Sequence, residues 1–252
     1  MSPRERRNRI LERLELDGKV EIIHLSEILS VTPMTIRRDF DVLEKQKKLI
    51  RTHGGAVAPQ GLIHERTFES KSSMAVEEKK AIAREATSFV RDGMTVLLDS
   101  GTTTLEIARL LKLRDKITVI TNDIKIAAEL MDSKLEIIVL GGRLQNDVGA
   151  LFGSLTEETL SGIHVDLFFL GAHAVHSTFG ITAPTFEKAA LKREMNKTAE
   201  QIILVTDSSK FNQKAFSKVC DLGDVTSVIT DDKLPVELKE MYSEYVDIVL
   251  AK

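Results

Sequence analysis

The sequence is short of the residues and segments that mark secreted, metal-binding and membrane proteins. It has a single cysteine, Cys220, which excludes an intrachain disulfide framework and any cysteine-based metal cluster. Its six histidines are scattered without the spacing of metal ligands. No apolar run approaches the roughly 20 residues of a membrane span, and residues 1–4 lack the apolar core of a signal peptide. We therefore expect a soluble, cytoplasmic protein that has no contact with a membrane.

The motifs of nucleotide, metal and acyl-transfer chemistry are missing as well. The chain contains no Walker sequence, no G-x-G-x-x-G and no H-E-x-x-H. No serine, histidine and aspartate carry the local motif of a hydrolase. We therefore expect no cofactor and no metal.

The composition is that of a folded protein with two different halves. The chain has 252 residues, 42% of them hydrophobic, and a net charge of only -3, which excludes global disorder and allows one large domain or two smaller ones. Residues 1–57 hold 12 of the 35 Lys and Arg and 9 of the 38 Asp and Glu, for a net charge of +3, and the rest has a net charge of -6. A basic head on an acidic body favours two modules with different partners.

Three short helices are predicted in residues 1–57. The first begins at Ser2-Pro3 and ends at Asp17-Gly18. The second is expected to bury Leu25, Ile28 and Leu29 on one face.

The third predicted helix begins at Thr32-Pro33, where a capping hydroxyl precedes a proline at the first helical position. Ile36, Phe40 and Leu43 follow at the spacing of one buried face, and residues 47–57 can form two short strands around a polar turn. Three helices and a basic wing describe a winged helix-turn-helix, whose third helix enters the major groove of double-stranded DNA.

We expect DNA contacts from seven residues of this module: Thr32, Met34, Thr35, Arg37, Arg38, Arg51 and His53. Arg37 and Arg38 can pair with guanine or hold phosphates. The basic residues Arg6, Arg7, Arg51 and His53 are expected on the DNA backbone. The residue pattern by itself leaves open a small helical bundle with a solvated basic face.

Residues 58–74 are predicted to be a linker, because they include Pro59 and Gly61 and lack sustained periodicity. From residue 75 to 252 the chain alternates helices with short, wholly apolar strands. The strands are predicted at residues 96–98, 117–120, 137–140, 167–170, 202–205, 227–229 and 248–250. Strands without polar alternation are buried on both faces, which predicts an α/β domain with a parallel sheet between helices. One helical stripe is expected to consist of Ile124, Ala127, Ala128 and Met131.

Polar loops follow five of these strands, where α/β sheets bind ligands. The first loop, residues 99–104, places Gly101 and four hydroxyls at a helix start, which favours a phosphate cradle over plain helix capping. Asp99 either accepts hydrogen bonds from sugar hydroxyls or braces the loop. The residues we expect to bind an anionic effector are Asp99, Ser100, Gly101, Thr102, Thr103, Thr104, Asn122, Gly141, Gly142, Arg143 and Lys210.

Two stretches in the N-terminal module closely resemble the DeoR family of bacterial sugar-metabolism regulators. They are TPMTIRRDF at residues 32–40 and HGGA at residues 53–56. The resemblance implies that the first stretch is the recognition helix and that the second ends the wing. Phe40 stands where the family usually has leucine, and Lys47-Lys48 stands where glycine is frequent. Glu65-Arg66 is similar to the family's hinge region or is a solvated ion pair.

The C-terminal module resembles the DeoR-type sensor domain, which is related to ribose-phosphate isomerases and glucosamine-phosphate deaminases. The motifs are DSGTTT at 99–104, TN at 121–122, GGR at 141–143 and DSSKF at 207–211. The resemblance implies that the domain binds a phosphorylated sugar without converting it. Residues 100–104 and Lys210 would hold the phosphate, and Asp99, Asn122 and Arg143 would line the pocket.

One motif departs from the family, which usually reads GADG or GANG after the fourth strand. Here the chain reads GAHA at 171–174, followed by VHST. His173 either contacts the ligand or is a loop histidine without a role. The effector of other family members therefore cannot be transferred to this chain.

The leading interpretation is a repressor of a carbohydrate-utilisation operon that a phosphorylated sugar releases from its operator. We expect a homo-oligomer, a dimer or tetramer, because paired half-sites need paired heads. An active isomerase or deaminase with a DNA-binding head is the alternative, with Asp99, Glu187 or His173 as its base. A body that only oligomerises is a third interpretation, which the polar strand-end loops disfavour.

Overall fold

The computed structural model describes residues 2–17, 19–46, 48–52, 54–57, 65 and 67–252. The chain divides into two compact units, residues 1–61 and 62–252. His53 and much of the expected linker, residues 58–64 and 66, lie outside the described residues.

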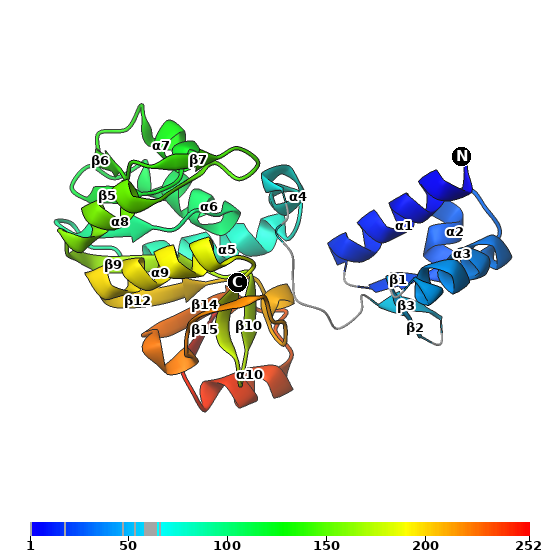
Figure 1. The fold of residues 1–252 in the computed structure, drawn as a ribbon. Coiled ribbons are helices and arrows are strands. Elements are labelled where there is room, and N and C mark those ends of the chain that lie inside the picture. The colour runs from blue at the N-terminus through cyan, green and yellow to red at the C-terminus, as the bar shows by residue number, and fades with distance from the viewer. Residues whose placement is uncertain (1, 18, 47, 53, 58–64, 66) are drawn as a thin grey trace. The chain divides into compact units, whose positions relative to one another are not determined.

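The N-terminal unit is the winged helix-turn-helix that the sequence predicts (Figure 1). Its helices are α1 (Pro3–Asp17), α2 (Ile22–Ile28) and α3 (Pro33–Lys45). Its strands β1 (Lys19–Glu21), β2 (Ile50–Arg51) and β3 (Gly55–Val57) form an antiparallel sheet in the order β1-β3-β2.

Local chemistry sets the helix boundaries of this unit. Ser2 and Glu5 form reciprocal hydrogen bonds at the start of α1, and the Thr32 hydroxyl accepts from the amide of Thr35 at the start of α3. Ile36 and Phe40 are fully buried in the core, as predicted. The expectation for Ile28 is wrong, because this last residue of α2 is 50% exposed.

The second unit is built on a seven-stranded parallel sheet in the order β15-β14-β12-β9-β4-β5-β6. These strands are β4 (Thr95–Leu98), β5 (Thr118–Thr121), β6 (Glu136–Val139), β9 (Val165–Gly171), β12 (Ala199–Val205), β14 (Ser227–Asp231) and β15 (Asp247–Ala251). Every pairing within the sheet is parallel. This confirms the α/β class that the apolar strands predict.

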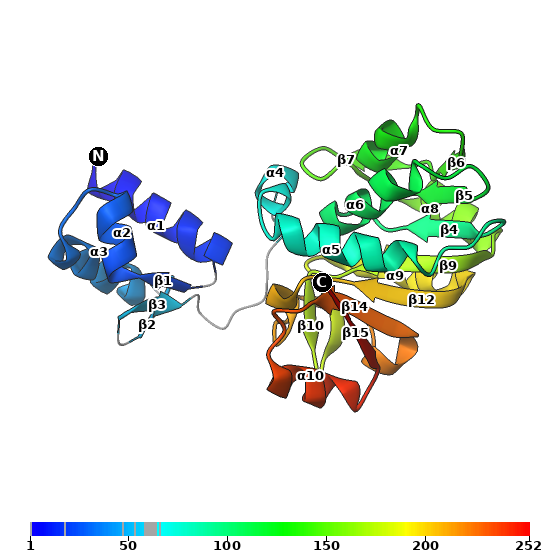
Figure 2. The ribbon, with the colours of Figure 1, turned by 180° about the vertical axis from the view of Figure 1, so that it is seen from behind.

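Helices cover both faces of this sheet. The α-helices of the unit are α4 (Phe68–Ser72), α5 (Val76–Thr87), α6 (Thr102–Leu111), α7 (Ile124–Leu130), α8 (Ser154–Ser161), α9 (Phe186–Thr198) and α10 (Val236–Ser243). Val96 and Leu98 belong to the core under α5, α6 and α7 (Figure 2), whereas Leu97 belongs to the core under α8 and α9 (Figure 1). Adjacent residues of one strand thus face different helix layers, which explains why the strands are apolar throughout.

The strand order reverses at the centre of the sheet. From β4 the chain runs outward through β5 to β6, and it then returns to place β9 on the other side of β4. Leu98 at the end of β4 pairs with Phe169 of β9, so the loops that follow the two strands are neighbours. Such a switch point is where open α/β sheets bind ligands.

Several elements were not predicted from the sequence. They are the hairpin of β7 (Arg143–Gln145) and β8 (Ala150–Phe152), the antiparallel sheet of β10 (Ala174–His176), β11 (Gly180–Ala183) and β13 (Ser217–Cys220), the helices α8 and α10, and two short 3-10 helices, η1 (Ser208–Lys210) and η2 (Leu222–Asp224). The stripe expected on α7 is also partly wrong. That helix buries Ile126 and Leu130, while Ile124 and Met131 are exposed.

The second unit takes in part of the stretch that we expected as a linker. It begins at residue 62, and α4 lies within it. The Phe68 amide donates to the Asp147 carbonyl at 3.1 Å, and the Phe68 ring packs against the core under α5 and α6. A helix of five residues is too short to show a periodic pattern, which is why the sequence gives no indication of it.

No helix among the described residues is long and apolar enough to cross a membrane. The described part of the chain also holds no group of three or more His, Cys, Asp or Glu side chains that could bind a metal.

Candidate functional site

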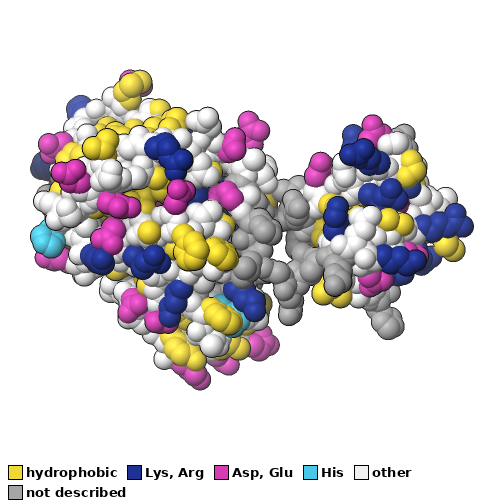
Figure 3. All heavy atoms as spheres, viewed as in Figure 1, with side chains coloured by type: hydrophobic (Ala, Val, Ile, Leu, Met, Phe, Trp, Pro, Cys, Tyr) yellow, Lys and Arg dark blue, Asp and Glu magenta, His cyan; other side chains and the backbone are white. Residues whose placement is uncertain are grey.

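Helix α3 presents the expected DNA-contacting side chains on the surface of the N-terminal unit. Arg37 and Arg38 are exposed, and so is Met34. The hydroxyls of Thr32 and Thr35 lie 3.0 Å apart at the helix start. Figure 3 shows several Lys and Arg side chains over the visible face of this unit.

Arg6, Arg7 and Arg51 each pair with an aspartate within the unit, with Arg7 3.8 Å from Asp39 Oδ1. Arg6, which we expected on the DNA backbone, forms a two-pronged ion pair with Asp39, with its Nε 2.5 Å from Oδ2 and its second nitrogen 3.2 Å from Oδ1. Asp39 is only 3% exposed, so the pair fastens α1 to α3. Arg51 on β2 forms an ion pair with Asp41 of α3 and so connects the wing to the recognition helix.

In the second unit, a small pocket lies at the switch point between β4 and β9. Its lining residues are Asp99, Ser100, Asn122, Phe152, His173, Lys188, Leu191 and Lys192. The structure thus brings together three of the expected effector-binding residues, Asp99, Ser100 and Asn122. It adds two lysines of α9 that the sequence analysis did not select.

Asp99 and Lys192 form a buried ion pair at this switch point. The Lys192 ammonium pairs with Asp99 Oδ2 and donates to the Gly171 carbonyl at 2.9 Å. The same carboxylate oxygen accepts from the Gly171 amide at 2.9 Å. Asp99 therefore holds the ends of β4 and β9 together. This agrees with the second of its two expected roles, bracing the loop.

His173 and Asn122 each offer a buried acceptor to the pocket. Burial lowers the pKa of His173 to about 4, although the hydrogen bond and the charge of Glu65 act to raise it, so the ring is neutral at neutral pH. A neutral ring donates its Nε2 proton to the Glu65 carboxylate, 3.3 Å away, which leaves Nδ1 as an acceptor. The Asn122 amide nitrogen donates to the Leu151 carbonyl at 3.2 Å. Neither His173 Nδ1 nor Asn122 Oδ1 has a hydrogen-bond partner among the described residues.

The loop at the start of α6 has unused backbone donors. Gly101 precedes the first turn, and the amides of Thr102, Thr103 and Thr104 have no acceptor among the residues that the structure describes. The Thr104 hydroxyl donates to the carbonyls of Asp99 and Gly101 within the loop. Ser100 donates to Asp123 at 2.7 Å. Two of the four hydroxyls thus stabilise the loop.

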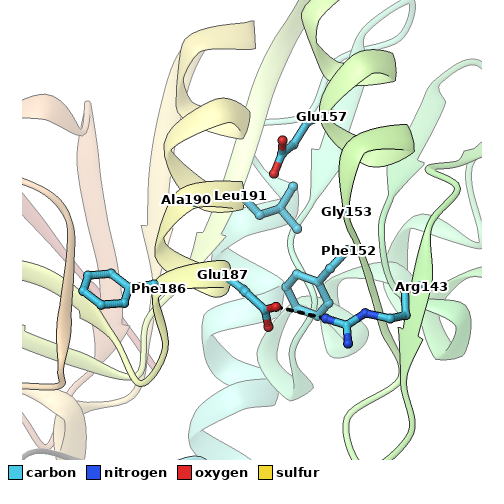
Figure 4. A pocket seen from close by; sticks show the side chains of 8 residues that line it. All are labelled: Arg143, Phe152, Gly153, Glu157, Phe186, Glu187, Ala190 and Leu191. Atoms are coloured by element: carbon cyan, nitrogen blue, oxygen red, sulfur yellow. Dashed lines mark hydrogen bonds and ion pairs between the residues drawn. The ribbon is translucent and has the colours of Figure 1, made fainter.

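Arg143 lines a second, larger pocket of about 330 Å³ that shares Phe152 and Leu191 with the first (Figure 4). Its guanidinium lies 2.9 Å from the Glu187 carboxylate at the start of α9. The neighbouring residue Gly142 has φ +139, and a side chain there would collide with the Phe152 carbonyl. The Gly141 carbonyl accepts from the Thr156 hydroxyl. Both glycines therefore have backbone roles beside the pockets.

Lys210 lies on η1, apart from both pockets. Its ammonium is 4.0 Å from Asp207 Oδ2. Asp207 and Lys210 also act in opposite directions on the pKa of Lys79, which burial lowers to about 8. Lys210 is therefore not among the residues that line either pocket, and its charge acts on Lys79.

The lysines that sequence reasoning missed lie on the buried face of α9. Lys188 and Lys192 are each only 5% exposed. They lie four residues apart, and the buried Met195 follows three residues later on the same face. The spacing of 188, 192 and 195 is that of one buried helix face. Two lysines on such a face are the signal that could have identified them as pocket residues.

Comparison with known proteins gives consistent results for both units. Residues 74–232 match the family model described as the DeoR C terminal sensor domain, and residues 6–61 match the DeoR-like helix-turn-helix domain. The chain is 34% identical to a putative aga operon transcriptional repressor of Escherichia coli O157:H7, over 98% of this chain and 93% of the relative. It is 36% identical to the HTH-type transcriptional repressor GlcR of Bacillus subtilis (strain 168), over 93% and 90%.

Solved structures resemble the chain more distantly. A ribose 5-phosphate isomerase A from Methanocaldococcus jannaschii is 20% identical, with a TM-score of 0.41, over 54% of this chain and 55% of that one.

Proposed function

Because the chain belongs to the DeoR family of helix-turn-helix transcriptional regulators, we propose that it represses a carbohydrate-utilisation operon in the cytoplasm and that a phosphorylated sugar releases it from its operator. Relatives that match nearly the whole chain are named transcriptional regulators. The chain is accordingly a regulator and not an isomerase or deaminase.

The lining of the switch-point pocket is the observation that supports a phosphorylated sugar as the effector. Asn122 Oδ1 and His173 Nδ1 are buried acceptors without partners among the described residues, and a buried acceptor is stabilised by a donor such as a sugar hydroxyl. Lys188 and Lys192 place two buried ammonium groups in the same lining. The hydroxyls of a ligand would donate to the two acceptors, and an anionic group would be attracted by the two ammonium groups, which already pair with Glu65 and Asp99. A phosphorylated sugar has both kinds of group.

The phosphate of such a ligand fits the start of α6. Amides without acceptors at a helix amino terminus attract anions through their N–H groups and the helix dipole. Thr102, Thr103 and Thr104 supply these amides, and Ser100, just before them, lines the pocket together with Lys188. We therefore place the phosphate between this turn and the Lys188 ammonium.

DNA binding is assigned to α3 and the wing. The exposed Arg37 and Arg38 suit base edges or phosphates in the major groove. Operators with paired half-sites require paired heads, so we propose a dimer or tetramer as the working form.

The test is a thermal-stability screen of the full chain against a panel of phosphorylated sugars and the matching free sugars. A ligand at about 100 times its dissociation constant stabilises the folded chain by roughly 2.7 kcal/mol. Each stabilising sugar phosphate is then added to the complex with duplex DNA that the protein selects from a random library, and we expect the DNA to be released. Substrate and product analysis of the same mixtures should show no conversion.

A matched pair of variants locates the site. Lys188→Met should abolish the shift, whereas Lys197→Met on the exposed side of the same helix should keep it. A full shift with Lys188→Met, or no shift with any sugar phosphate, would contradict the proposal.

A further inference from the structure

The larger pocket adjoins the switch-point pocket and lies between α8, α9 and the hairpin of β7 and β8 (Figure 4). Phe152 and Leu191 line both pockets, so the two hollows meet at these side chains. Lys188 Nζ lies 5.8 Å from the centre of the Phe152 ring. A ligand that is held by Lys188 in the first pocket can therefore extend past Phe152 into the second.

The two pockets differ greatly in size. The switch-point pocket has a volume of about 10 Å³, which is roughly the room of one water molecule, whereas the larger pocket has about 330 Å³. Pockets that bind small molecules usually measure about 300–1,000 Å³. The first pocket is thus too small for a sugar ring, and the larger one has room for it.

The charges of the two linings differ as well. Two lysines and a single carboxylate line the switch-point pocket. The larger pocket is lined by one guanidinium, that of Arg143, and by two carboxylates, those of Glu157 and Glu187. An excess of negative charge repels a phosphate and suits an uncharged group that donates hydrogen bonds. Charge therefore directs the phosphate of a ligand towards the lysines and its uncharged part into the larger pocket.

The larger pocket combines an apolar floor with a polar rim. Phe152 and Leu191 are only 9% and 3% exposed, and their carbon atoms can contact the C–H face of a ring. The side chains of Arg143 and Glu187 are 75% and 69% exposed and meet through one contact of 2.9 Å. A guanidinium has five N–H donors and a carboxylate about four acceptor sites, so one contact between them leaves capacity for the hydroxyls of a ligand.

We propose that the larger pocket binds the ring of the effector, which makes the effector a hexose phosphate rather than a short acyclic phosphate. The inference rests on the proposed function, because it takes the phosphate to lie between the start of α6 and Lys188. From there the ring extends over Phe152 and Leu191, and its hydroxyls bind the pair of Arg143 and Glu187. A three-carbon phosphate has no ring to fill this pocket.

Calorimetry of the full chain tests the inference with the 6-phosphates of glucose, galactose, mannose and fructose, and with glycerol 3-phosphate and inorganic phosphate. At least one hexose phosphate should bind roughly tenfold or more tightly than inorganic phosphate, which is about the contribution of one hydrogen bond to a charged group. Glycerol 3-phosphate should bind about as weakly as inorganic phosphate.

Variants of the lining show whether the larger pocket is responsible. Ala190→Phe fills this pocket from α9 and should remove most of the advantage of the hexose phosphate over inorganic phosphate. Ala128→Phe is the matched control and should keep the advantage, because Ala128 is an exposed alanine of α7 that lines neither pocket. Glu187→Ala, at an exposed side chain, should reduce the same advantage and serves if Ala190→Phe does not fold.

An unchanged advantage in both Ala190→Phe and Glu187→Ala would overturn the inference, and so would equal affinities of the wild type for all the probes. Either result leaves the proposed phosphate site standing as long as inorganic phosphate binds, and if no probe binds, both proposals fall. If a hexose phosphate binds through the larger pocket but releases no operator DNA, the ring subsite stands and the proposed function is wrong.

Discussion

At the scale of single residues, the main feature of the sensor unit is a set of charged side chains that are buried, where apolar side chains are expected. Lys192 and Asp99 are buried and hold the ends of β4 and β9 together through Gly171. A buried ion pair is costly to desolvate, and removing one partner leaves the other charge without compensation. The pair is therefore both a brace and a weak point of the fold.

We expect Lys192→Met to lower the free energy of unfolding of the sensor unit by about 3–5 kcal/mol, because Asp99 is left as an unpaired buried charge. The double variant Lys192→Met, Asp99→Asn should lose much less, since no charge remains. Urea unfolding followed by circular dichroism measures both. A loss below about 1 kcal/mol, the usual size for an exposed pair, would show that the pair is not buried in solution.

His173 should make the stability of the sensor unit depend on pH. Its pKa is about 4 in the folded protein and near 6.5 when unfolded, so the unfolded chain binds the extra proton between these values. The free energy of unfolding should therefore fall as the pH falls from 6.5 towards 4. Urea titrations at about pH 7.5 and about pH 5 compare the wild type with His173→Asn, which cannot titrate there. Equal losses in the two proteins would refute the assignment.

Only part of the site could be predicted from single residues. Asp99, Ser100 and Asn122 follow strands, and parallel strands place such residues at one edge of the sheet. Lys188 lies in the first turn of α9 and Lys192 in its middle. Lysines on a helix are normally solvated, so their spacing with Met195 is the one local sign that they are buried. Their position depends on how α9 packs on the sheet, which is a tertiary property.

At the scale of elements, the recognition helix α3 is positioned from both sides. The Asp39 pair with Arg6 holds it to α1, and the Asp41 pair with Arg51 holds it to the wing. Its buried face holds Phe40, and its outer face presents Arg38. A fixed helix can present its exposed side chains to DNA without first losing conformational entropy.

Arg38→Ala should weaken operator binding by about 1–3 kcal/mol, or roughly 5- to 150-fold. The melting temperature should not change, because the side chain is exposed. Fluorescence anisotropy with operator DNA measures the loss, and Arg84→Ala on α5 of the sensor unit is the control. Unchanged operator affinity would mean that Arg38 does not contact the operator.

Elements with a clear period were predictable, and short or irregular ones were not. The seven strands of the parallel sheet are apolar runs between polar loops, and each was found at its place in the sequence. The pieces of the small antiparallel sheet, such as β10 with three residues, are too short to show alternation. On α7 the apolar residues allow more than one stripe, and packing against the sheet selects Ile126 and Leu130.

At the scale of the whole molecule, the DNA-binding unit and the sensor unit have separate hydrophobic cores. The apolar residues of the DNA-binding unit form one cluster, and those of the sensor form two clusters on the two faces of its sheet. The uneven charge of the sequence follows the same division. Separate cores agree with the proposed function, in which the effector acts on DNA binding without refolding the head.

The central position of β4 has a consequence for synthesis of the chain. β4 is the first strand of the sheet to be made, yet its partner β9 begins only at Val165, long after β4 ends at Leu98. A ribosome adds about 5–20 residues per second, so the edge of β4 stays unpaired for roughly 3 to 14 s. During that time an apolar strand edge is open to pairing with other nascent chains. The head is complete by then, so on a polysome the growing sensor, rather than the head, is the part at risk of aggregation.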